Sequence, residues 1–115
     1  MSAFPDFKRL YEAFNARDIE AVLPMLAGDV DWPNGFEGGR VRGRDAVRDY
    51  WLRQWREIDP HVEPKGIGVL KDGRVALEVR QVVKDRKGAV LSDTTVLHVY
   101  RIEHGLIAGM DIDVA

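Results

Sequence analysis

A His-Gly pair near the C-terminus constrains the fold of this chain more than any other feature. His104 and Gly105 separate two runs rich in β-forming residues, at 94–102 and 106–114. A two-residue turn with positive φ at both centres accepts glycine freely and tolerates histidine better than a β-branched residue. The pattern therefore predicts an antiparallel hairpin that turns at these two residues.

The register of this hairpin predicts a candidate site. Counting back from the turn pairs Glu103 with Leu106 and places His98 opposite Asp111. Directly opposed side chains have Cβ atoms roughly 4.5 to 5.5 Å apart, so the imidazole and the carboxylate could share a proton. A carboxylate on the inner, apolar face needs such a partner or a hydrated cavity. The pair is either catalytic or a buried structural pair that holds the strand register.

Helical spacing dominates the N-terminal half. Apolar side chains recur at intervals of three and four residues and predict helices over about residues 7–14, 19–27 and 45–58. Asp18 is the expected N-cap of the second helix, which Pro24 should bend and Gly28 should end. A short strand at 29–32 then leads into a glycine-rich loop at 33–43, which lacks the Gly-Lys-Ser/Thr ending of a phosphate-binding loop.

The C-terminal half reads as a meander of strands over 61–70, 74–84 and 89–102, before the last strand of the hairpin. Pro64 predicts an edge position or a bulge in the first of them. A four-residue loop at 85–88 would place Arg80 opposite Asp93 and Glu78 opposite Thr95 on the outer face. The inner face would then be mostly apolar and covered by the helices, with Val75, Leu77, Val79, Thr94, Val96, His98 and Tyr100 on it. The fold class predicted is α+β, with three N-terminal helices packed on an antiparallel sheet.

Composition excludes several classes of function. The 115 residues predict one domain over 1–115, and the net charge of -2 argues against a nucleic-acid or membrane partner. No run approaches the roughly 18 apolar residues of a membrane span. The chain has no cysteine and no signal-peptide pattern at residues 1–6, so a cytoplasmic location is expected. The three histidines show no paired spacing, so no metal site is expected.

Three segments and the closing hairpin resemble the nuclear-transport-factor-2-like superfamily. They are Tyr-Glu-Ala-Phe-Asn-Ala-Arg-Asp at 11–18, Leu-Ala-Gly-Asp-Val-Asp-Trp at 26–32 and Gly-Arg-Asp-Ala-Val at 43–47. The chain is most similar to the SnoaL-like and ketosteroid-isomerase-like members, over about residues 4–113. This resemblance implies a strongly curved sheet that forms a conical apolar pocket with the helices, a cystatin-like roll, and often a homodimer through the outer sheet face. The superfamily contains isomerases, cyclases, dehydratases, hydrolases and non-catalytic proteins, so fold does not decide function.

The resemblance transfers only some functional residues. Ketosteroid isomerases use a tyrosine on the first helix, an aspartate base after the first strand and a protonated acid on the penultimate strand. The matching positions here are Leu10, which neighbours Tyr11, then Asn34 and His98. Asn34 cannot take a proton, so steroid isomerisation is not expected. SnoaL-type cyclases resemble this chain more closely at its end, where a histidine and an acid/base aspartate match His98 and Asp111.

Two functions remain open from the sequence. The first is a cofactor-free isomerase, cyclase or lyase for a small hydrophobic carbonyl compound, with Asp111 as acid/base and His98 as its partner. The alternative is a non-catalytic dimeric module that binds a small hydrophobic ligand or a protein. In both cases the outer face with Glu78, Arg80, Asp93 and Thr95 is the expected dimer surface. The residues expected to line the pocket are Tyr11, Phe14, Trp32, Asn34, Trp51, Trp55, Val96 and Tyr100, although the tryptophans lie at a spacing that also suits simple core packing.

Overall fold

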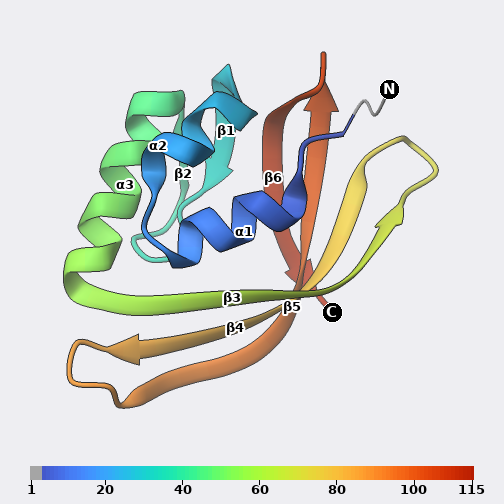
Figure 1. Ribbon diagram of the computed structural model, residues 1–115. Coiled ribbons are helices and arrows are strands. Elements are labelled where there is room, and N and C mark those ends of the chain that lie inside the picture. Colours follow the sequence, from blue (N-terminus) through green and yellow to red (C-terminus); the bar gives the residue numbers. More distant parts are fainter. Residues whose placement is uncertain (1–3) are drawn as a thin grey trace.

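A curved sheet of six strands wraps around the helices, which gather on one side of it (Figure 1). The computed structural model describes residues 4–115; residues 1–3, part of the segment in which no signal peptide was expected, lie outside the described part. In chain order the elements are α1 (Phe7–Asn15), α2 (Ile19–Val22), the 3₁₀ turn η1 (Leu23–Met25), β1 (Leu26–Pro33), β2 (Arg40–Arg42), α3 (Arg44–Glu57), β3 (Ile58–Val69), β4 (Val75–Asp85), β5 (Val90–Glu103) and β6 (Leu106–Val114). The α+β class with helices first and a meander last is confirmed.

The strand order is β2-β1-β6-β5-β4-β3. The pairing of β1 with β6 is parallel, and the other pairings are antiparallel. Within the segment expected to be a loop at 33–43, residues Arg40–Arg42 form β2 and pair with the end of β1. So short a strand carries too few residues for a visible period-two pattern, which explains why the sequence did not reveal it.

The second helix differs from its prediction at its C-terminal end. Its N-cap is Asp18, as expected, and the Asp18 carboxylate accepts a hydrogen bond from the backbone N–H of Ala21 at 3.3 Å. The α-helix ends at Val22, however, and Pro24 lies in the 3₁₀ turn that follows. Proline has no N–H for the helical ladder, so the chain leaves the α-helix instead of bending within it. Gly28 consequently lies in β1 and does not end a helix.

The core lies between the helices and the inner face of the sheet. α1 contributes Phe7, Leu10 and Tyr11, and α3 contributes Val47, Tyr50 and Trp51, all of them buried. From the sheet, the predicted inner face is confirmed for Val75, Leu77, Val79, His98 and Tyr100, which are all buried. Full burial of one large apolar side chain contributes about 1.5 to 3 kcal/mol, so these contacts hold the helices on the sheet.

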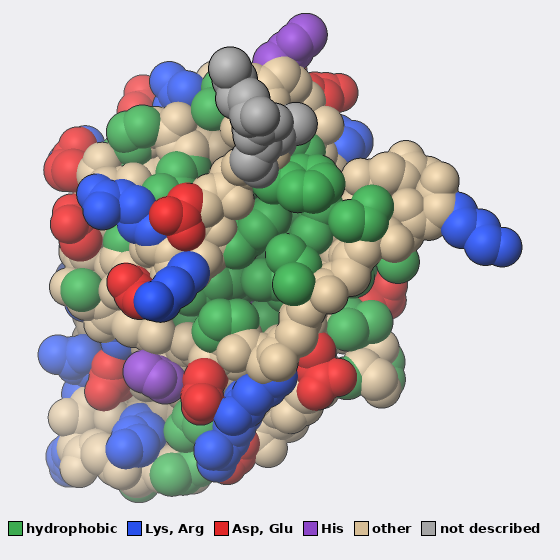
Figure 2. Space-filling view, turned by 45° about the vertical axis from the view of Figure 1, so that its right-hand side comes forward, with side chains coloured by type: hydrophobic (Ala, Val, Ile, Leu, Met, Phe, Trp, Pro, Cys, Tyr) green, Lys and Arg blue, Asp and Glu red, His purple; other side chains and the backbone are tan. Residues whose placement is uncertain are grey.

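The inner face of the sheet extends beyond the cover of the helices. Ile67 and Val69 pair with the buried Leu77 and Val75, yet they are 63% and 60% exposed near the β3–β4 turn. Figure 2 shows a continuous apolar area on one face of the molecule, bordered by charged side chains. Pro64 behaves as predicted, because β3 is an edge strand and its register with β4 shifts between Pro64 and Gly66.

The register of β4 with β5 differs from the prediction by two residues. Arg80 lies opposite Thr95 and Glu78 opposite Leu97, because the pairing shifts near the β4–β5 turn. A shift of two keeps every side chain on its face, since the side-chain period of a strand is two. Arg80 therefore still reaches Asp93, with Nε–Oδ1 and Nη2–Oδ2 distances of 2.9 and 2.6 Å.

Candidate functional site

The β5–β6 hairpin turns where the sequence predicted but contains an extra residue. Glu103 pairs with Leu106, and His104 and Gly105 have φ angles of 52° and 76°. The register then shifts, since Ile102 pairs with Ile107 and Arg101 pairs with Gly109. Ala108 of β6 is left without an opposite residue, which is a β-bulge.

This bulge overturns the predicted pairing of His98 with Asp111. His98 lies opposite Ile112, and Asp111 lies opposite Val99 on the outer face. The Asp111 side chain is 60% exposed, and its Oδ1 lies 3.0 Å from Nη1 of Arg40. One inserted residue moves every later side chain to the other face, so the carboxylates stay in water and apolar side chains fill the interior. The expected acid/base pair is therefore absent.

His98 is instead part of a hydrogen-bond chain of four side chains, of which Tyr11, His98 and Tyr100 are buried and Gln81 is half-buried. Its Nδ1 lies 2.8 Å from the Tyr11 hydroxyl, and its Nε2 lies 2.6 Å from Oε1 of Gln81. The Tyr11 hydroxyl also lies 2.7 Å from the Tyr100 hydroxyl. His98 is only 4% exposed and Tyr100 only 1%. The chain thus joins α1, β4 and β5, and it satisfies polar atoms that would otherwise be costly to bury.

Burial keeps the three titratable side chains of this hydrogen-bond chain neutral. It lowers the pKa of His98 to about 4, because the charged imidazolium would lose its hydration. Burial also raises the pKa of Tyr11 and of Tyr100 far above the ordinary value. At neutral pH, His98 is therefore uncharged and both tyrosines keep their protons.

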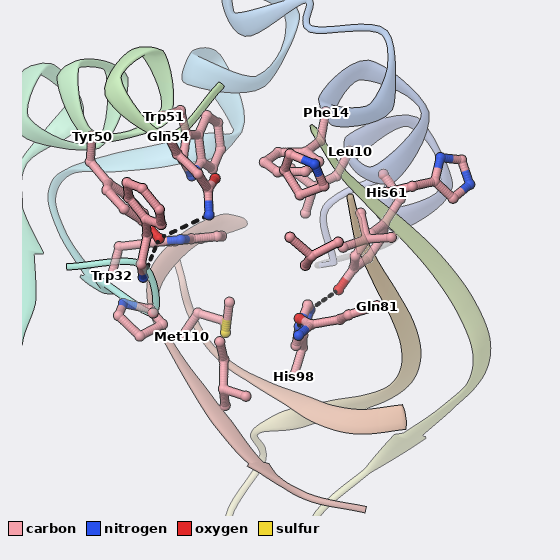
Figure 3. Close-up of a pocket in the computed structure, with 18 of the residues that line it drawn as sticks. Leu10, Phe14, Trp32, Tyr50, Trp51, Gln54, His61, Gln81, His98 and Met110 are labelled. Atoms are coloured by element: carbon pink, nitrogen blue, oxygen red, sulfur yellow. Dashed lines mark hydrogen bonds between the residues drawn. The ribbon is translucent and has the colours of Figure 1, made fainter. Parts of the chain in front are cut away.

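A cavity of about 270 Å³ lies between the sheet and the helices, beside this chain. Figure 3 shows Gln81 and His98 on one side of it and Trp32 and Tyr50 on the other. Among the described residues that line it there is no Asp, Glu, Lys or Arg. Its walls are largely aromatic and aliphatic, with Leu10, Phe14, Trp32, Trp51, Met110 and Ile112 among them. The cavity is therefore largely apolar, with a few polar side chains that include His61 and His98.

The structure places six of the predicted site residues around this cavity: Tyr11, Phe14, Trp32, Trp51, His98 and Tyr100. Phe14 and Trp32 each meet Trp51 edge to face, with ring centroids 5.3 and 5.5 Å apart. Such aromatic pairs are rigid, since each ring fixes the rotamer of the next. These tryptophans therefore both pack the core and form a wall of the cavity.

Three residues predicted to line the pocket do not lie along it. The Asn34 amide holds the following loop, because its Oδ1 accepts from the Glu37 backbone N–H at 2.7 Å. Trp55 packs against Phe14 outside the cavity, with ring centroids 5.4 Å apart. Val96 lies opposite Val114 at the far end of β6, beyond the lining. Helical and strand periodicity predicted the inward face of Trp55 and Val96 but not how far along the element the cavity extends.

Five polar lining residues were missed from the sequence: Tyr50, Gln54, His61, Gln81 and Ser92. Gln81 follows Val75, Leu77 and Val79 at a spacing of two, so strand alternation could have placed it on the inner face. Tyr50 lies in α3 directly before Trp51, which was predicted to line the pocket. Its hydroxyl accepts hydrogen bonds from the Phe36 backbone N–H and the Gln54 amide, both at 3.3 Å.

Charged residues gather outside the cavity, where β1, β2 and β6 meet. Arg40 binds Asp31 through Nε at 2.8 Å and the Met110 carbonyl through Nη2 at 2.6 Å. The hydrogen bond from Arg40 holds the pKa of Asp31 below its usual value. These contacts tie the short β2 to the sheet. In residues 4–115, no three His, Asp or Glu side chains are grouped so that they could hold a metal ion, and no helix is long and apolar enough to cross a bilayer.

Solved structures with the same fold support the conical architecture. An NTF2-like protein of unknown function from Burkholderia pseudomallei has a TM-score of 0.80 at 25% identity, over 95% of this chain and 87% of that one. A putative polyketide cyclase from Sinorhizobium meliloti has a TM-score of 0.78 at 21% identity, over 98% and 100%. A Mycobacterium tuberculosis protein, solved in complex with estradiol-17β-hemisuccinate, has a TM-score of 0.77 at 19% identity, over 92% and 88%. No curated protein matches the sequence.

The family follows from the sequence match and agrees with these structures. The family model of the SnoaL-like domain matches residues 7–110, which is nearly all of the chain. The resemblance seen in the segments at 11–18, 26–32 and 43–47 is thereby confirmed. This chain belongs to the SnoaL-like family, within the NTF2-like proteins of conical α+β fold.

Proposed function

We propose that this protein binds a small, uncharged and mostly apolar molecule in its cavity. The observation that carries the proposal is the composition of the lining, which is rich in aromatic rings and contains no Asp, Glu, Lys or Arg among the described residues. Flat aromatic walls suit a flat hydrophobic ligand. The Mycobacterium tuberculosis structure, with a steroid ester bound to the same fold, supports a small-molecule role.

Size and charge narrow the ligand class. Ligand pockets typically measure about 300 to 1,000 Å³, so a cavity of about 270 Å³ suits a compact molecule of two or three rings. A charged ligand would lose its hydration there without finding an opposite charge, which is costly. An uncharged ring compound with one or two polar atoms fits the lining best.

The structure favours binding over the acid/base enzyme expected from Asp111. That carboxylate lies on the outer face in an ion pair with Arg40. His98 is a poor base at neutral pH, because burial lowers its pKa to about 4 and both of its ring nitrogens already have partners. A cofactor-free isomerase, cyclase or lyase would need another proton acceptor at the cavity, and the one other histidine among the described lining residues is His61. We therefore place ligand binding first.

Calorimetric titration with two matched probes tests this proposal. 2-Acetylnaphthalene is a neutral two-ring ketone, and 2-naphthoate has the same rings with a carboxylate. We expect the ketone to bind at least about tenfold more tightly, because the lining offers the carboxylate no cation. Failure of the ketone to bind, or equal affinity for the carboxylate, would contradict the proposal.

Variants of β6 test whether the ketone binds inside the cavity. Ile112 lines the cavity, so Ile112→Trp should fill it and abolish binding of the ketone. Val114→Trp is the matched control, since Val114 lies two residues further on the same strand, is 88% exposed and lies outside the lining. Asp111→Asn should bind the ketone like the wild type, because Asp111 faces the other way.

The expected homodimer also remains a proposal. We propose that two copies pair through the outer face of β4 and β5, where the Arg80–Asp93 ion pair is exposed. The resemblance to the superfamily supports this pairing. The alternative use of that face, for a different protein partner, would leave the cavity and its ligand unchanged.

A further inference from the structure

The chain of hydrogen bonds from Tyr100 to Gln81 has a direction. We infer that the buried Tyr100 hydroxyl sets this direction, so that Gln81 presents its amide N–H groups to the cavity and the site selects ligands that carry a hydrogen-bond acceptor, such as a carbonyl. Tyr100 acts in this as a positioning residue. The inference rests on the proposed ligand-binding function and names the class of ligand more closely.

Two arrangements of protons run in a single direction along all four side chains. A neutral imidazole has one N–H and one acceptor nitrogen. In the first, Tyr100 donates to Tyr11, Tyr11 donates to Nδ1 of His98, and Nε2–H of His98 donates to Oε1 of Gln81. In the second, all three bonds are reversed: the Gln81 amide nitrogen donates to Nε2, Nδ1–H donates to Tyr11, and Tyr11 donates to Tyr100.

The two arrangements differ at Tyr100. In the second, the Tyr100 O–H would have no acceptor, because Tyr11 is the one hydrogen-bond partner of its hydroxyl in the part of the chain that the structure describes. Tyr100 is 1% exposed, so water cannot replace that acceptor at its surface. A buried donor without an acceptor bears its full desolvation cost. In the first arrangement, every O–H group and the imidazole N–H group along the hydrogen-bond chain has an acceptor. This arrangement is therefore the more stable one.

The orientation of Gln81 follows from the tautomer of His98. With Nε2 protonated, Gln81 must turn its carbonyl oxygen toward the ring, and Oε1 does lie 2.6 Å from Nε2. The amide nitrogen of Gln81 then has no partner within residues 4–115, and Gln81 lines the cavity beside His98 (Figure 3). An amide nitrogen donates hydrogen bonds and does not accept them. The carbonyl oxygen of a ligand bound near this nitrogen would accept a hydrogen bond from it, and would thus keep a polar partner when it is buried.

The tautomer of His98 can be measured without any ligand. Long-range ¹H–¹⁵N correlation spectra of protein labelled at histidine distinguish Nε2–H from Nδ1–H. We expect Nε2–H at neutral pH in the wild type. Detection of Nδ1–H would overturn the inference whatever the protein binds, and this measurement requires no variant to fold.

Two phenylalanine variants test the role of Tyr100. Tyr100→Phe removes the buried O–H that disfavours the reverse direction, so His98 should show a mixture of both tautomers. Tyr50→Phe is the matched control, because Tyr50 lines the cavity but its hydroxyl is not part of the hydrogen-bond chain. It should leave His98 as Nε2–H. An unchanged tautomer in folded Tyr100→Phe would show that Tyr100 does not set the direction.

Ligand preference is the second readout. 2-Isopropenylnaphthalene replaces the carbonyl oxygen of 2-acetylnaphthalene by a methylene group and keeps its shape. The wild type should prefer the ketone by about tenfold, because the alkene leaves the Gln81 N–H groups without an acceptor. Tyr100→Phe should lose most of this preference.

The outcomes separate this inference from the proposed function. If neither probe binds, the proposed function fails, and the tautomer still decides the direction of the chain. If both bind equally to a wild type that shows Nε2–H, ligand binding stands and the selection of acceptors is wrong.

Discussion

His98 shows how surroundings decide what a side chain can do. On the sequence it stands opposite a carboxylate that would raise its pKa, whereas in the structure it faces two uncharged partners, Tyr11 and Gln81. No opposite charge compensates its burial, so its pKa falls to about 4. The residue is therefore a fixed hydrogen-bonding group at neutral pH and not a proton shuttle.

This pKa predicts how stability depends on pH. The folded protein binds a proton at His98 only near pH 4, whereas the unfolded chain does so near pH 6.5. Stability from neutral His98 is thus complete above pH 6.5 and is lost as the pH falls toward 4. Since one pKa unit corresponds to about 1.4 kcal/mol, the loss between pH 7.5 and pH 5 is about 2 kcal/mol.

Urea unfolding of the wild type and of His98→Gln at pH 7.5 and pH 5 measures this loss. The wild type should lose about 2 kcal/mol more than the variant over this range. Carboxylates such as Asp31 titrate alike in both proteins and cancel in the comparison. An equal loss in both proteins would show that His98 is not held neutral.

At the scale of elements, the bulge in β6 decides which residues face the cavity. Ala108 is 1% exposed and has no opposite residue in β5. Because of this one residue, Met110 and Ile112 line the cavity and Asp111 lies outside. A regular hairpin would turn the Asp111 carboxylate toward the apolar interior, which is costly.

Insertion of one alanine between Met110 and Asp111 should therefore destabilise the protein severely. It would move Asp111 from its place opposite Val99 to one opposite His98 and so turn this carboxylate inward. The matched control is insertion of one alanine after Val114, beyond the last residue of β6 that pairs with β5. Circular dichroism during thermal unfolding compares the two. An inward-turning variant that melts like the control would show that the faces of β6 do not depend on its residue count.

At the scale of the whole molecule, the inner and the outer face of the curved sheet have different roles. The inner face holds the core and the cavity, and the outer face carries exposed ion pairs such as Arg80–Asp93. A sheet face of this kind is open to pairing with a second copy. The cavity, by contrast, is completed within one chain by residues of α1, α3 and the sheet.

The proposed dimer is tested by size-exclusion chromatography with light scattering. We expect twice the mass of one chain. The double variant Glu78→Arg/Thr95→Arg adds like charges to the outer face and should shift the protein to monomers, while ketone binding stays unchanged. A wild type that elutes at the mass of one chain would contradict the dimer.

The sequence by itself determined the family, the α+β class, the turn at His104 and Gly105 and the faces of most strands and helices, because these depend on local periodicity and turn chemistry. It also indicated six of the residues around the cavity, since inward-facing aromatic residues follow the same periods. Only the tertiary structure decided the bulge at Ala108, the partners of His98 and the direction of their hydrogen bonds. A bulge is stabilised by the burial and hydration of residues further along the strand, and a tautomer by groups on other elements, so neither leaves a local pattern in the sequence.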